Sequence, residues 1–179
     1  MRIKDYLYIF LIAMVPIVEL RGAIPVAYGI KAALGKAALE NPGSVDPESF
    51  NLLLAYVIIA IGNMIPVPFI FFFARRILEW GKDKKVIGKF FTWCLKKGEK
   101  GGQKLQSKAG RGLYVALLLF VGIPLPGTGA WTGTLAASFL DMDFKKSVLA
   151  VIGGVVLASV IVGVLCTLGF GAWFGIAGQ

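Results

Sequence analysis

The sequence Pro124-Leu-Pro-Gly-Thr-Gly129 lies in the middle of 29 uncharged residues, Gly112 to Leu140. The two prolines remove helix hydrogen bonds, and the glycines permit a reversal of the chain. As helices, the arms on either side (residues 112–123 and 130–140) would each be under about 20 Å long, too short to cross a membrane core of about 30 Å. The region therefore predicts a re-entrant helical hairpin whose broken tip lies inside the membrane.

A second interrupted apolar region lies near the N-terminus. The apolar run Tyr6 to Val18 is followed by Glu19-Leu-Arg-Gly-Ala-Ile-Pro25, after which a second arm extends from Val26 to Leu39. Charged residues and a proline in the middle of an apolar region predict a break, so we expect a re-entrant helical hairpin here as well.

Two other interpretations of the N-terminal region remain open. Residues 6–30 could form a single kinked span with the N-terminus inside, because the positive-inside rule disfavours Arg2 and Lys4 on the outer side. The same two basic residues, followed by an apolar run, also fit a secretory signal peptide, but no convincing Ala-x-Ala cleavage site follows them.

Two further segments are long enough to cross a membrane. Asn51 to Ala74 contains 24 residues without a charge, which as a helix would extend for about 36 Å. Ser147 to Gln179 contains 33 uncharged residues, and we expect a span there that ends near Phe170. Both segments predict transmembrane helices.

Particular residues within these two spans suggest further properties. Asn63, Pro66 and Pro68 interrupt the first span and predict either a hinge or cavity wall or a static kink. In the second span, Gly154 and Ala158 stand four residues apart. Small residues at that spacing let helices approach closely, either within the chain or across a homodimer.

The composition places the chain among membrane proteins. Hydrophobic residues make up 57% of the 179 residues and charged residues only 16%, against about 25% in a typical soluble domain. These values exclude a disordered chain, a secreted disulfide scaffold and most soluble enzymes. Histidine is absent, which excludes catalytic triads and metal sites built on histidine. We therefore expect no enzymatic activity, metal or cofactor.

The net positive charge comes from one segment, and acids and bases balance in the rest of the chain. Residues 75–111 contain twelve basic and three acidic residues, which accounts for the whole net charge of +9. A basic loop between apolar segments indicates the cytoplasmic side of a membrane rather than a nucleic-acid partner. Apolar residues recur at helical spacing over residues 86–95, which predicts an amphipathic helix on the inner leaflet.

The order of these segments predicts an inverted-topology repeat. Residues 1–75 would form a hairpin and a span, residues 76–111 the basic cytoplasmic segment, and residues 112–179 a second hairpin and span of opposite orientation. Many secondary transporters have this architecture. The predicted fold is thus an all-α integral membrane protein with a single membrane domain: two re-entrant hairpins, each followed by a transmembrane helix, and one amphipathic helix.

Glu19 and Arg21 are the one acid and base deep within an apolar region. A charge at the middle of a membrane costs at least about 2.5 kcal/mol, and such residues usually pair or face a water-filled cavity. The two side chains could form a mutual ion pair that pins the hairpin tip. We expect a functional role as well, with Glu19 as a candidate proton-coupling carboxylate.

Helix N-termini at the two tips would provide an anion site. Pro25 suits the first position of a helix, and Thr128 suits the N-cap of a helix that starts near Ala130. With Arg21, the free N–H groups would bind phosphate or carboxylate, unless side chains cap those groups. The candidate substrate-binding or coupling residues are Glu19, Arg21, Gly22, Pro25, Asn63, Pro124, Pro126, Gly127, Thr128 and Gly129.

The string Glu19-Leu-Arg-Gly-Ala-Ile-Pro25, together with Pro124-Leu-Pro-Gly-Thr-Gly-Ala-Trp-Thr-Gly133, resembles the putative small multidrug export protein family, which looks like a branch of the DedA/VTT superfamily. The resemblance covers nearly the whole chain. It implies paired re-entrant hairpins in a prokaryotic inner membrane, and it implies transport of lipids, including polyprenyl phosphates, or proton-dependent transport. Many DedA proteins carry an arginine within the second motif, whereas here Arg111 precedes it.

We therefore expect a multi-pass transporter or flippase of the inner (plasma) membrane that moves an amphipathic substrate, such as an anionic lipid, with possible coupling to protons. One alternative is an exporter of lipophilic cationic drugs, in which Glu19 attracts the cation. Another is a non-transporting membrane assembly protein, which would keep its function if both tip charges were replaced by apolar residues. An intramembrane enzyme is disfavoured because histidine is absent.

Overall fold

The structure is a computed structural model that describes residues 2–81, 92, 112–125 and 127–177. Within these residues every regular element is a helix. Two helical segments, Pro47–Phe73 and Phe144–Gly169, are long and apolar enough to cross a membrane. They coincide closely with the two spans predicted from the sequence, so the predicted all-helical architecture with two candidate membrane spans is confirmed.

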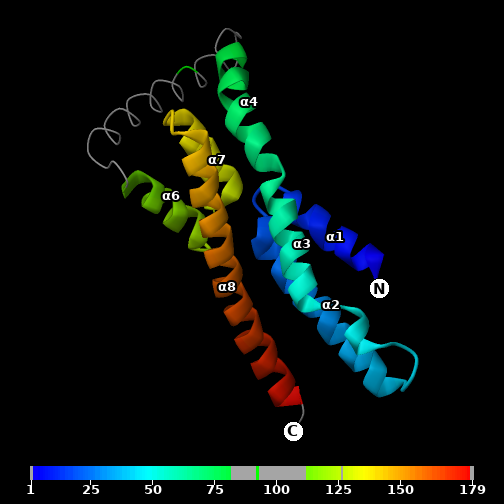
Figure 1. Ribbon diagram of the computed structural model, residues 1–179. Helices are drawn as coiled ribbons and strands as arrows, with labels where there is room; N and C mark the ends of the chain where they lie inside the picture. The colour runs from blue at the N-terminus through cyan, green and yellow to red at the C-terminus, as the bar shows by residue number, and fades with distance from the viewer. Residues whose placement is uncertain (1, 82–91, 93–111, 126, 178–179) are drawn as a thin grey trace.

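The first two helices pack against each other (Figure 1). Helix α1 comprises Ile3–Met14 and α2 comprises Glu19–Glu40. The chain reverses at residues 15–18, because Pro16 cannot continue a helix and disfavours helical geometry in the residue before it. The prediction of a break at residues 19–25 is wrong, since α2 begins at Glu19 and contains Pro25 in its interior.

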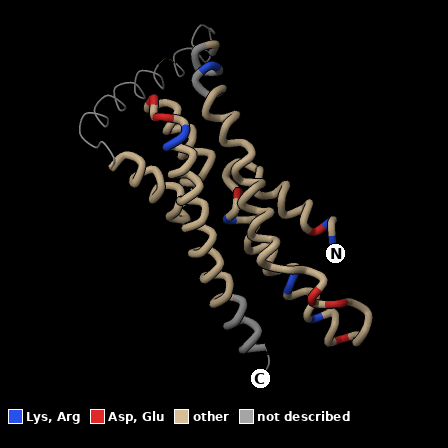
Figure 2. Tube along the Cα trace, viewed as in Figure 1, with Lys and Arg blue, Asp and Glu red and all other residues tan. Residues whose placement is uncertain are grey.

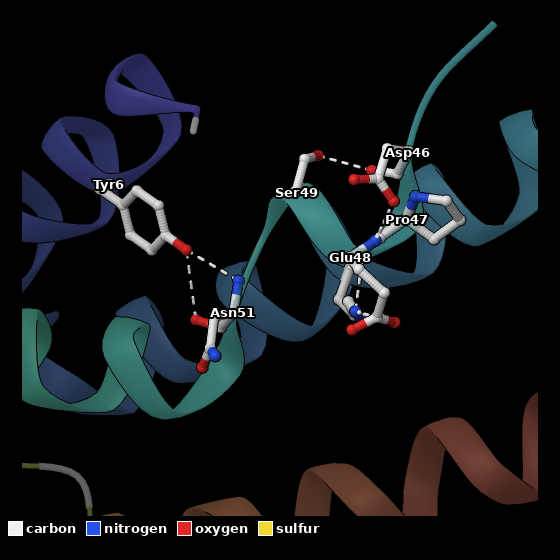
Figure 3. Close-up of polar contacts among 7 residues, drawn as sticks. Tyr6, Asp46, Pro47, Glu48, Ser49 and Asn51 are labelled. Carbon is white, nitrogen blue, oxygen red and sulfur yellow. Dashed lines mark hydrogen bonds and ion pairs between the residues drawn. The ribbon is translucent and has the colours of Figure 1, made fainter. Parts of the chain in front are cut away.

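A short connection returns the chain to the start of α1. The 3-10 helix η1 comprises Pro47–Ser49 and its N-cap is Asp46. In Figure 3 the Tyr6 hydroxyl lies between the backbone N–H and C=O of Asn51, at 2.7 and 3.4 Å, and the Tyr6 ring stacks on Phe50. These contacts fix the start of α3 against the first turns of α1. The bounds of α1 and α2, with a reversal between them, also exclude one kinked helix over residues 6–30.

The first long span is interrupted where the sequence predicts. Helix α3 comprises Leu52–Met64 and α4 comprises Pro66–Gly81, with Ile65 between them. Pro66 lacks the N–H that would extend α3, but it suits the first turn of α4. At the other end, the Asn51 side chain caps α3 by accepting a hydrogen bond of 3.1 Å from the backbone N–H of Leu54.

The second half of the chain follows its predicted bounds closely. Helix α6 comprises Gly112–Gly122, α7 comprises Ala130–Phe139 and α8 comprises Phe144–Ala177. Helix α6 packs along α8, where Gly154 lies against Leu118 and Val121. This glycine therefore allows close packing within one chain. A homodimer stays a prediction.

The long helices α3–α4 and α8 run along the length of the molecule, and the turns that follow α1 and α6 lie near its middle (Figure 1). Figure 2 shows charged residues toward the ends of the helices, apart from one acidic and one basic position at the centre. The predicted amphipathic helix over residues 86–95 and most of the basic segment 75–111 lie outside the described residues.

Candidate functional site

The Glu19 carboxylate joins the two turns of the molecule. Glu19 is the first residue of α2, and only 2% of its surface is exposed. Its Oε2 accepts a hydrogen bond of 3.1 Å from the backbone N–H of Ala130, and its Oε1 accepts one of 2.9 Å from that of Trp131. These are the first two residues of α7. Because a helix N-terminus carries partial positive charge, the carboxylate stabilises it by charge as well as by hydrogen bonding.

Gly129 makes this contact sterically possible. A Cβ atom on Gly129 would overlap the carboxylate group of Glu19. The backbone at Gly129 also has φ 143° and ψ −174°, a conformation that is essentially restricted to glycine. The second turn therefore needs glycine at this position both for its shape and for the approach of Glu19.

Arg21 binds the second turn as well, through residues 123–128 that precede α7. Its guanidinium group donates to the carbonyl oxygens of Leu125 at 2.7 Å and Ile123 at 3.3 Å, to the carbonyl of Thr128, and to the Thr128 hydroxyl at 2.7 Å. The carbonyl groups after α6 have no helical partners of their own, and Arg21 supplies the donors. In the described part of the chain, Glu19 and Arg21 bond to the second turn and not to each other.

The predicted capping scheme is wrong at both helix starts. Thr128 is not the N-cap of α7: its hydroxyl donates to the carbonyls of Ile123 and Leu125, each at 2.9 Å, and Gly129 is the N-cap. Pro25 lies inside α2 rather than at its first position. The expected open anion site is also wrong at α7, because Glu19 itself occupies the N–H groups of Ala130 and Trp131.

Other predicted site residues have lesser roles in this contact. Gly22 lies against the Val18 side chain, so that a Cβ atom would clash there. Gly127 has φ 81° with open space around it, and Pro124 is half-buried in the same turn. Pro126 lies outside the described residues.

Asn63 is completely buried, with 0% exposure, and neither its Oδ1 nor its Nδ2 atom has a partner in the described part of the chain. Thr134 was not predicted as a site residue. It is 1% exposed, and its hydroxyl has no hydrogen-bond partner among the described residues. The sequence did contain a signal for Thr134: it stands four residues after Ala130, so the two residues lie on the same face of α7.

A comparison with protein-family models gives one family, described as "Putative small multi-drug export protein", which matches residues 19–161. The match begins at Glu19, directly after the first turn, and includes the whole of the second turn. Comparisons with curated proteins and with solved structures gave no match. Because the family model covers most of the chain, including Glu19, Arg21 and the turn that they bind, the protein belongs to the putative small multi-drug export protein family.

Proposed function

We propose that this protein is a membrane exporter of small amphipathic molecules, in which the contact between the two turns is the gate and Glu19 is the proton-coupling group. One observation carries the proposal. The Glu19 carboxylate is buried and bound to the first two N–H groups of α7, in the other half of the chain. A buried carboxylate that holds two halves of a membrane protein together is well placed to convert proton binding into movement.

The proposal includes an inverted repeat of residues 1–75 and 112–179. Helices α1, α6 and α7 have 12, 11 and 10 residues, which is too short to cross a membrane core of about 30 Å. Helix α2 has 22 residues, but it contains five charged residues and is not one of the two candidate membrane spans. Each helix pair opens toward a different end of the molecule and is followed by a long span (Figure 1). On this basis we assign α1–α2 and α6–α7 as re-entrant hairpins in a multi-pass protein of the plasma membrane, with residues 75–111 in the cytoplasm.

Protonation of Glu19 would weaken the gate. A proton bound to one carboxylate oxygen removes the negative charge and leaves that oxygen a poorer acceptor for the N–H of Ala130 or Trp131. Hydrogen bonds to a charged group contribute about 1.5–3 kcal/mol, against about 0.5–1.5 kcal/mol for neutral groups. The turns would therefore separate more readily in the protonated state, and loss of the proton would close them again.

The site chemistry favours a cationic substrate over an anionic one. In the open state Glu19 carries a proton, and a lipophilic cation that reaches the site would compete with that proton for the carboxylate, so that one positive charge is exchanged for another. An anionic lipid headgroup would have to compete with Glu19 for the N–H groups of α7, and the Arg21 guanidinium already donates to four oxygen atoms. The family name refers to multi-drug export, which agrees with a small amphipathic substrate rather than a lipid.

The test uses the purified protein in liposomes with an imposed pH gradient. A fluorescent lipophilic cation and a labelled polyprenyl phosphate are followed in parallel, with Glu19→Gln as the variant and Glu48→Gln as the exposed control. We expect gradient-driven movement of the cation, lost more than tenfold in Glu19→Gln and unchanged in Glu48→Gln.

Three outcomes would contradict this proposal. Unchanged cation transport by Glu19→Gln would remove Glu19 from coupling. Movement of the polyprenyl phosphate alone would assign a lipid substrate. Full cellular function of a variant carrying both Glu19→Leu and Arg21→Leu would indicate an assembly protein that depends on packing alone.

A further inference from the structure

Polar side chains form a line on the face of α7 that packs against α4. Ala130, whose N–H binds Glu19, is followed at intervals of four residues by Thr134 and Ser138. Residues four apart lie one above another on a helix, and the distance along the helix from Ala130 to Ser138 is about 12 Å. Both hydroxyl residues are buried. The line therefore runs from the Glu19 carboxylate to the end of α7, close to the exposed residues Asp141 and Asp143.

Asn63 lies opposite the start of this line, as two separate contacts indicate. The Ser138 hydroxyl donates to the Phe71 carbonyl at 2.7 Å, and α4 and α7 run side by side in the same direction (Figure 1). Eight residues back from Phe71, across the break at Ile65, stands Asn63 at the end of α3, and eight residues back from Ser138 stands Ala130 at the start of α7.

The second contact is at the neighbouring residue. Gly62 packs on the backbone of Phe10 and on Ala13, in the last turns of α1 before the reversal that leads to Glu19. This end of α3, and with it the buried residue Asn63, therefore lies near the turn that leads to Glu19.

The unpartnered atoms of Asn63 and Thr134 define the ligand that would fit them. Nearly all buried polar groups in proteins bond to another protein group or to ordered water, yet Asn63 Oδ1, Asn63 Nδ2 and Thr134 Oγ1 have no partner among the described residues. A bare metal cation would satisfy the oxygen atoms and leave the Nδ2 donors unpaired. A water molecule donates and accepts, so it can satisfy all three atoms.

We infer that water binds between α7 and the α3–α4 helix at Asn63 and Thr134, and that this water connects Glu19 to the end of α7. The inference rests on the proposed proton-coupling role of Glu19. A proton leaves a Glu19 carboxyl oxygen for the first water of this line, which passes one of its own protons to the next water beside Thr134. The transfer repeats along the line until the last water gives a proton to bulk solvent at the α7–α8 connection. Ser138 continues the polar line at its outer end.

The charged groups that face this route lie at its two ends. At the outer end, the α7–α8 connection and the start of α8 carry Asp141, Asp143, Lys145 and Lys146. Arg21 is the charged residue nearest to Glu19 in sequence, and it binds the second turn. Helices α2, α3, α6 and α7 contribute no other acid or base near it: α3, α6 and α7 contain none, and those of α2 begin at Lys31. The acids and bases of α1, α4 and α8 lie near the helix ends away from Glu19, at residues 4–5, 75–79 and 145–146.

Cysteine accessibility tests the route without reference to transport. In a background of Cys94→Ser and Cys166→Ala, the variants Thr134→Cys and Ser138→Cys are reconstituted and exposed to a small, water-soluble, cationic methanethiosulfonate reagent. The reagent is added on the side of the α7–α8 connection. Ala137→Cys is the matched control, because Ala137 is a fully buried small residue of the same helix.

We expect cysteine at positions 134 and 138 to react at least tenfold faster than at position 137. Equal rates at positions 134 and 137 in variants that unfold at the wild-type temperature would overturn the water route. A second variant keeps the test independent of cysteine: Thr134→Val should slow gradient-driven transport about tenfold, whereas Thr132→Val on another face of α7 should not.

The two proposals fail in different ways. If transport does not depend on the proton gradient but position 134 is accessible, the proposed coupling is wrong and the water site remains. If Glu19→Gln abolishes gradient-driven transport but position 134 is as unreactive as position 137, the coupling remains and the water route is wrong.

Discussion

Gly129→Ala is the substitution whose effect follows most directly from the contact between the turns. The added methyl group would occupy the position of the Glu19 carboxylate, and the backbone conformation, with φ 143°, is unsuited to alanine. Backbone strain of this kind costs about 1–3 kcal/mol. Displacement of Glu19 from two N–H groups costs a further 3 kcal/mol or so, at about 1.5 kcal/mol for each hydrogen bond to a charged group.

We therefore expect Gly129→Ala to destabilise the protein by about 4–6 kcal/mol. For a chain of this length, 1 kcal/mol corresponds to about 2–4 °C in the unfolding temperature, so the loss is about 8–24 °C. The measurement is thermal unfolding of the purified protein in detergent. Gly127→Ala is the matched control, because Gly127 also has a positive φ of 81° but open space around it. It should cost about 1–2 kcal/mol.

A double-mutant cycle separates the clash from the backbone strain. In a Glu19→Ala background no carboxylate is present, so Gly129→Ala should cost only the strain of about 1–3 kcal/mol. If Gly129→Ala costs the same with and without Glu19, the carboxylate does not occupy the space beside Gly129, and the proposed gate loses its structural basis.

Three further substitutions test separate contacts by the same unfolding measurement. Arg21→Lys should destabilise by about 3 kcal/mol, because one ammonium group cannot serve the carbonyls and hydroxyl that the guanidinium fork binds; a wild-type unfolding temperature would contradict that geometry. Tyr6→Phe should cost about 1 kcal/mol, because it leaves the backbone N–H of Asn51, the N-cap of α3, without its hydrogen-bond partner. Its control is Tyr8→Phe, which changes an exposed side chain and should cost nothing measurable. Gly154→Ala should cost about 1–3 kcal/mol, since a Cβ atom there would lie 2.7 Å from the Leu118 carbonyl; an unchanged stability would mean that α6 and α8 pack less closely.

The elements that depend on local rules could be predicted from the sequence. The α6 and α7 bounds follow from two prolines and two glycines in an apolar run, since these residues end helices and permit reversals wherever they occur. The break between α3 and α4 follows from Pro66 in the same way. Length and the absence of charge were sufficient to identify both long spans.

The first turn shows where local rules fail. It contains no glycine, yet Ile17 and Glu19 have positive φ values of 73° and 50°. Such conformations are costly for residues other than glycine and persist only when surrounding contacts impose them. For Glu19 those contacts are the N–H groups of α7, more than a hundred residues away in the chain. The end of α1 follows from Pro16, a local signal that the prediction passed over in favour of the charges and Pro25. The start of α2 at Glu19 depends on the distant contact, which the sequence does not reveal.

The sequence by itself determined that the chain is helical, that two segments can span a membrane, and that one acid and one base lie deep in an apolar region. It could not determine their partners, since a buried carboxylate can bind an arginine, a ligand or a helix N-terminus at similar free energy. The tertiary structure decided this by bringing the second turn to the first, where Glu19 meets the N–H groups of α7 and Arg21 meets the carbonyl oxygens that follow α6. Complementary dipoles separated widely in the chain become partners only once the helices have packed.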